Sequence, residues 1–128
     1  MIHLTDHDFE PMLVKVRDMV TGQTISSEEL VQYLIELDRN IEDNDFILDF
    51  ATRFETYVLK SLPIKKFNIG EGEISRMTVD DYSQLYQQSA WCPPVLYDRM
   101  EGLVDGYHRV SAIKRVGGEK VPAFIGKE

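Results

Sequence analysis

One short segment of the chain carries residue types that suit the binding of an anion. In residues 103–112, Asp105, Gly106, His108 and Arg109 directly follow a short apolar run. A glycine after a strand lets the backbone turn sharply, and a helix that begins at the next residue leaves its first N–H groups without helical acceptors. Those N–H groups and the helix dipole attract anions, and an arginine can hold a phosphate with two parallel hydrogen bonds. The segment therefore predicts an anion site.

The same side chains also have structural interpretations. Arg109 can pair with an acidic neighbour while His108 packs. Asp105 can hold Mg²⁺ or accept a proton, which makes it our candidate catalytic residue, or it can cap the helix that follows it. Ser111 can support a phosphate, or its hydroxyl can bond to its own helix. These alternatives stay open on the residues alone.

The elements that would position this segment are short and alternate in type. After Pro63, apolar spacing and turn residues predict a strand, a helix that Thr78 begins, a β-hairpin, a second helix and a closing strand. Their expected ranges are residues 64–69, 78–89, 95–97 with 103–104, 107–116 and 121–125. The segment of interest is then the junction between the hairpin and the second helix.

The first half of the chain has a helical pattern. Apolar residues recur at helical spacing over residues 9–20, 30–37 and about 45–60. Ser26 with Glu29 three residues later forms a capping box for the second of these helices. We therefore predict an α+β fold, in which an acidic helical module of residues 1–61 precedes a small mixed-sheet domain of residues 62–128.

Charge is unevenly distributed between these two parts. Residues 1–62 carry 13 acidic and five basic side chains, whereas residues 63–128 carry nine of each, so the net charge of −8 belongs to the first part. A chain this acidic is expected to bind duplex DNA poorly by itself, because phosphate contacts need a basic surface. The acidic part has two explanations: it keeps the protein soluble, or it binds a basic partner.

The remaining composition excludes several classes of protein. No run of about 18 apolar residues is present, and the N-terminus lacks the pattern of a secretory signal, so no membrane association is expected. Cys92 is the only cysteine, which rules out an internal disulfide and fits a cytoplasmic protein. The three histidines show no metal-ligand spacing, and no metal site is predicted.

The segment after the hairpin resembles the ParB/sulfiredoxin superfamily, whose hallmark is Gly-x-[His/Arg]-Arg-x-x-Ala. The matching residues are Gly106, Tyr107, His108, Arg109, Val110, Ser111 and Ala112. The likeness extends over about residues 62–126, from an opening strand at Leu62 to a Val-Pro strand at Val121. Arg76 corresponds to an arginine that family members often carry before the first helix of this domain.

The resemblance implies a nucleotide site at residues 105–109 that takes a nucleoside triphosphate, ATP or CTP, with Mg²⁺. Gly106, His108 and Arg109 would hold phosphate, Arg76 and Ser111 would assist, and Tyr107 lies inside the binding turn. Tyr107 departs from the family, since sulfiredoxins have a nucleophilic cysteine there and ParB proteins tend to have glutamate. A phenol with a reference pKa of about 10 is a weak base at neutral pH, and we expect Cys92 to be a small packed residue.

Two functions follow from these observations. The first is nucleotide or phosphate binding at residues 105–109, with phosphohydrolase or nuclease activity. The second is a catalytically inactive regulatory protein, of the kind found on mobile elements or in immunity, that uses its acidic helices to bind a basic partner.

Overall fold

The strands of the chain join in one mixed sheet. Within the residues that the computed structural model describes, which are 11–67, 76–89 and 91–128, the strand order is β1-β2-β5-β3-β4. The strands are β1 (Thr24–Ser26), β2 (Thr56–Pro63), β3 (Val95–Asp98), β4 (Gly102–Asp105) and β5 (Lys120–Gly126). The long β5 lies at the centre, antiparallel to β2 and parallel to β3.

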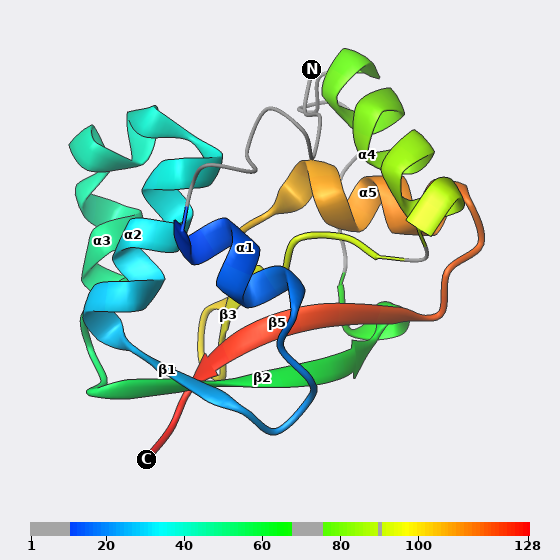
Figure 1. Ribbon diagram of the computed structural model, residues 1–128. Helices are drawn as coiled ribbons and strands as arrows, with labels where there is room; N and C mark the ends of the chain where they lie inside the picture. Colours follow the sequence, from blue (N-terminus) through cyan, green and yellow to red (C-terminus); the bar gives the residue numbers. More distant parts are fainter. Residues whose placement is uncertain (1–10, 68–75, 90) are drawn as a thin grey trace.

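The helices fill the connections between these strands. They are α1 (Pro11–Arg17), α2 (Ser27–Leu37), α3 (Asp45–Ala51), α4 (Arg76–Ser89) and α5 (Tyr107–Arg115), with the 3-10 helices η2 (Arg39–Asp43) and η3 (Ile64–Lys66). Figure 1 shows α2 and α3 at one end of the molecule and α4 with α5 at the other. The α+β class expected from the sequence is confirmed. None of these helices has the length and apolar character to span a bilayer.

The core consists of two clusters that meet on β5. Phe124 packs with side chains of α1, α2 and α3, whereas its neighbours Ala123 and Ile125 pack with those of α4 and α5. Because successive side chains of a strand point to opposite faces of the sheet, the two clusters lie on opposite faces of β5. Each half of the chain thus buries its apolar residues against the same strand.

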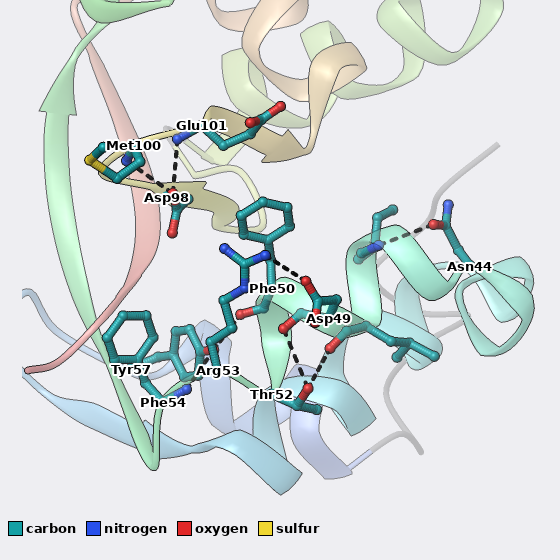
Figure 2. A network of polar contacts seen from close by, with 12 residues as sticks. Asn44, Asp49, Phe50, Thr52, Arg53, Phe54, Tyr57, Asp98, Met100 and Glu101 are labelled. Atoms are coloured by element: carbon teal, nitrogen blue, oxygen red, sulfur yellow. Dashed lines mark hydrogen bonds and ion pairs between the residues drawn. The ribbon is translucent and has the colours of Figure 1, made fainter.

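Four features that surround the candidate turn form as expected, namely α2, the β3–β4 hairpin, α5 and β5, and the first two have a clear local cause. In the capping box of α2, the Ser26 hydroxyl accepts the N–H of Glu29 at 3.1 Å and Glu29 accepts the N–H of Ser26 at 3.0 Å. In the β3–β4 hairpin, the Asp98 carboxylate accepts the N–H groups of Met100 and Glu101 at 2.9 and 2.8 Å (Figure 2). The helix and closing strand expected after Gly106 are α5 and β5.

Two expectations about the middle of the chain are wrong. The third helix ends at Ala51 instead of near residue 60, and residues 56–63 form β2, which pairs with β5 over seven residues. The strand expected at residues 64–69 is a 3-10 helix at Ile64–Lys66, and the residues after 67 in that range lie outside the described part. The boundary placed between residues 61 and 62 falls inside β2. Pairing with β5 outweighs the helical spacing of this apolar run.

Candidate functional site

The turn at Gly106 depends on the absence of a side chain. Gly106 has φ +117°, in the left-handed region that glycine adopts without strain. A Cβ atom at this position would lie 2.4 Å from Cγ1 of Val95 on the adjacent strand. Gly106 is the N-cap of α5 and gives no side-chain cap hydrogen bond. The chain therefore passes directly from β4 into the first turn of α5.

Arg109, in that first turn, points into the protein. It is 4% exposed, and its Nη1 donates to the carbonyl oxygens of Pro94 at 2.8 Å and Pro93 at 3.3 Å. Its Nη2 donates to Oδ2 of Asp105 at 3.1 Å. The structure therefore contains the pairing with an acidic neighbour that we considered for this arginine. The guanidinium is a buried brace between α5, β4 and the segment that leads into β3.

The guanidinium of Arg109 stays protonated although it is buried. Burial by itself lowers the pKa of the guanidinium, but the attraction of Asp105, with smaller effects of Tyr33 and Tyr82, outweighs burial and raises the pKa above its ordinary value. Arg109 is therefore positively charged over the whole physiological range. The positive charge stays close to the turn although the guanidinium faces inward.

Asp105 does not act as the helix cap that we considered. The cap position belongs to Gly106, and Oδ2 of Asp105 accepts the hydrogen bond from Arg109. The Asp105 side chain is 24% exposed and also lines a cavity beside the turn. A carboxylate at this position can meet a ligand while its other oxygen is held by the protein.

That cavity lies between the two halves of the chain and has a volume of about 460 Å³. Small-molecule sites commonly occupy clefts of about 300–1,000 Å³. One wall comes from the end of α2, from η2 and from α3, through Leu37, Asp38, Asn40, Ile41, Asn44 and Ile47. The opposite wall comes from α4 and from the turn, through Asp81, Tyr82 and the five residues from Asp105 to Arg109.

His108 and Tyr107 occupy the turn itself. Burial, and then the charge of Arg109, lower the pKa of His108 below its ordinary value, against a weaker opposite effect of Asp105. The imidazole is therefore neutral at neutral pH and can donate from only one nitrogen. Tyr107 is 46% exposed, and its hydroxyl donates to the carbonyl of Leu103 at 3.1 Å.

Two further residues predicted for the site, Ser111 and Arg76, are not among the described residues that line the cavity. Ser111 is on α5, two residues after Arg109, and is not among the residues that line the cavity. Arg76 is the first residue of α4, but its side chain lies outside the described residues. The structure thus brings Asp105, Gly106, Tyr107, His108 and Arg109 together and does not join Ser111 to them.

Sequence reasoning missed the contribution of the first half of the chain. Tyr33 of α2 donates its hydroxyl to the carbonyl of Pro94 at 2.6 Å, and Nη1 of Arg109 lies 3.5 Å from the same hydroxyl. Asp38, Asn40 and Asn44 line the same cavity as the turn. The only local signal for Tyr33 was its place beside Leu34 in an apolar stripe, where a buried hydroxyl needs a partner.

Three acidic residues, Asp38, Asp81 and Asp105, are among those that line the cavity. In the parts of the chain that the structure describes, no group of three or more His, Cys, Asp or Glu side chains is arranged to hold a metal ion. A metal ion here would need ligands from a bound molecule as well. Such shared coordination is usual for Mg²⁺, which commonly uses one or two carboxylates together with substrate phosphates.

Comparisons with known proteins give one structural similarity. No protein family model matches the chain, and no curated protein matches it. Among solved structures, the chain is similar to a Pnob8-like ParB-N domain, with 21% sequence identity and a TM-score of 0.46. The similarity covers 56% of this chain and 31% of the other, so the match spans about a third of that structure.

Proposed function

We propose that the chain binds the phosphate groups of a nucleotide, as the Mg²⁺ complex, in the cavity at the first turn of α5. The observation that carries the proposal is the start of α5. The helix begins at Tyr107, directly after the N-cap residue Gly106 and without a side-chain cap, and its first turn lines a cavity of about 460 Å³. The nucleoside triphosphates ATP and CTP are the ligands that we favour.

The physical support comes from the backbone of α5. The first N–H groups of a helix have no helical acceptors, and the helix dipole adds a partial positive charge at the same end. A phosphate at this position accepts those hydrogen bonds without needing a free arginine. Arg109 contributes its positive charge and holds the turn, and His108 can donate from its imidazole.

The acidic side chains of the cavity support binding of the Mg²⁺ complex rather than the free anion. Asp38, Asp81 and Asp105 would repel a naked phosphate across the same space. One or two of these carboxylates together with phosphate oxygens match the coordination that Mg²⁺ prefers. Asp105 is our candidate for such a ligand, or for a proton acceptor if the chain hydrolyses the bound nucleotide.

The test is a titration of ATP, ADP, CTP and GTP into the protein by calorimetry, with Mg²⁺ and then with EDTA. We expect saturable, Mg²⁺-dependent binding. His108→Glu places a carboxylate in the first turn and should weaken binding at least about tenfold. Gln88→Glu adds the same charge on an exposed part of α4 and should leave the dissociation constant unchanged. Absence of saturable binding by all four nucleotides would reject the proposal.

Phosphate release in the same samples separates the two kinds of function. Release that Asp105→Asn abolishes would support a phosphohydrolase, and oligonucleotide cleavage would support a nuclease. Binding without turnover would support a regulatory protein.

If the protein is regulatory, we propose that the exposed carboxylates Glu42, Asp43 and Asp45 on η2 and α3 bind a basic partner. A lysine-rich peptide should then bind the protein, and added salt should weaken that binding. Binding that does not depend on salt would argue against a basic partner.

A further inference from the structure

Tyr33 connects the first half of the chain to the turn at Gly106. It lies on α2, is fully buried, and its ring packs edge-on against Phe124, with 5.6 Å between ring centroids. Its hydroxyl donates to the carbonyl oxygen of Pro94, 61 residues away in the sequence, at 2.6 Å. This hydrogen bond crosses from the helical half into the segment that leads into β3.

The carbonyl of Pro94 is shared between two donors. It also accepts a hydrogen bond from Nη1 of Arg109 at 2.8 Å, and that nitrogen is 3.5 Å from the Tyr33 hydroxyl oxygen. The hydroxyl, the carbonyl and the guanidinium therefore form a closed triangle. Because Nη2 of Arg109 bonds to Asp105, the triangle continues to the residue before Gly106.

A tyrosine at this position does more than fill space. A phenylalanine would make the same ring contact with Phe124, so the hydroxyl is the group that requires explanation. Burial raises the pKa of Tyr33 well above its ordinary value, and the hydroxyl therefore stays protonated and remains a donor. In a buried setting, hydrogen bonds to a charged group are stronger than at the surface and fix geometry more firmly.

We propose that Tyr33 is a positioning residue for the phosphate-binding turn: through Pro94 and Arg109 its hydroxyl fixes the direction of the first turn of α5. The inference rests on the proposed function of that turn. It makes α2 part of the binding site, although Tyr33 does not line the cavity. Nucleotide affinity then depends on a hydroxyl in the helical half of the chain.

Two tyrosines allow a matched comparison. Tyr33→Phe removes the hydroxyl under study. Tyr57→Phe removes the hydroxyl of another buried tyrosine, which donates to the carbonyl of Phe50. The hydrogen bonds of the Tyr57 hydroxyl are to Phe50 and Phe54 and lie outside the triangle of Tyr33, Pro94 and Arg109, so its loss should affect stability without affecting the turn.

The experiment measures three quantities for the full chain and both variants. They are the midpoint of urea unfolding, the dissociation constant of whichever Mg²⁺-nucleotide binds the unmodified chain most tightly, and the amide NMR shifts of residues 106–109 without ligand. We expect both variants to lose similar stability. Only Tyr33→Phe should weaken binding, about fivefold or more, and shift those amides. Arg109→Lys should show the same pattern and replaces Tyr33→Phe if that variant does not fold.

The possible failures are distinct. Equal affinity and unchanged amide shifts in Tyr33→Phe would overturn the role of Tyr33 and leave the proposed function standing. Equal weakening of binding by Tyr33→Phe and Tyr57→Phe would also overturn it, because binding would then follow stability alone. Absence of nucleotide binding by the unmodified chain would overturn the proposed function, and this inference with it.

Discussion

Arg109 and Asp105 form an ion pair across the turn at Gly106, with 3.1 Å between Nη2 and Oδ2. The arginine side chain is 5% exposed and the aspartate side chain 24% exposed. The two residues are four positions apart, but one belongs to α5 and the other ends β4. The pair therefore fixes the angle between a strand and the helix that follows it.

Removal of the Arg109 side chain should lower the free energy of unfolding much more than removal of the Asp105 charge. Arg109→Ala leaves the Asp105 carboxylate and two proline carbonyls without their donor, and we expect a loss of about 3 kcal/mol in the free energy of unfolding. Asp105→Asn retains an acceptor and should cost about 1 kcal/mol. Urea denaturation followed by circular dichroism measures both. Equal losses would contradict the bracing role of Arg109.

Gly106→Ala tests the close approach of the turn to Val95. The substitution combines a positive φ with a Cβ 2.4 Å from Cγ1 of Val95, and we expect a loss of at least about 2 kcal/mol. Gly117→Ala is the control, since Gly117 also has positive φ, +78°, but no heavy atom lies within 4 Å of its Cβ position. Gly117→Ala should lower the free energy of unfolding by about 1 kcal/mol. The difference between the two thermal or urea midpoints reports the steric contact together with the larger backbone strain at φ +117°.

His108 should make the protein less stable in acid. Its pKa in the folded protein is lowered by burial and by Arg109, while in the unfolded chain it lies at about 6.5. Between these two pKa values the unfolded chain binds more protons, so stability falls as pH drops through this interval and is fully regained above it. His108→Gln should lack this component of the pH dependence. An NMR titration that gives His108 an ordinary or raised pKa would contradict the prediction.

Cys92 should be unreactive while the protein is folded. It is 1% exposed, and burial raises the pKa of its thiol to about 12, so the reactive thiolate is almost absent at neutral pH. A chromogenic disulfide reagent should therefore modify Cys92 only at the rate at which the protein opens. Addition of urea should accelerate the reaction in parallel with unfolding. Fast modification of the native protein would contradict this account.

Local signals were sufficient to predict several elements. The capping box of Ser26 and Glu29 marks the start of α2, and the Gly106 turn marks the start of α5. In both cases the residues that determine the structure are neighbours in the sequence. By contrast, Tyr57 fits both a helix and a strand, since it has apolar partners at helical spacing and at alternate positions. Its strand depends on pairing with β5, about 70 residues later, which no local pattern contains.

The candidate site also has one part that the local sequence predicts and one part that depends on distant residues. The sequence places a glycine, a histidine and an arginine at the start of a helix, and the structure has them there. It does not determine that Arg109 turns inward, because the acceptors at Pro93 and Pro94 and the hydroxyl of Tyr33 come from other parts of the chain. The direction of a side chain depends on its partners, and these become neighbours only on folding.

The central place of β5 has a consequence for how the protein folds. Without residues 120–126, β1 and β2 form one two-stranded ribbon and β3 and β4 another, and isolated ribbons of this size are marginal in water. Each becomes part of a larger sheet only when β5 inserts between them, after the loops that separate β5 from both partners have closed. We therefore expect the two halves to unfold in a single cooperative transition, and folding to be slow for a chain of this length because its sheet is made from non-local pairings.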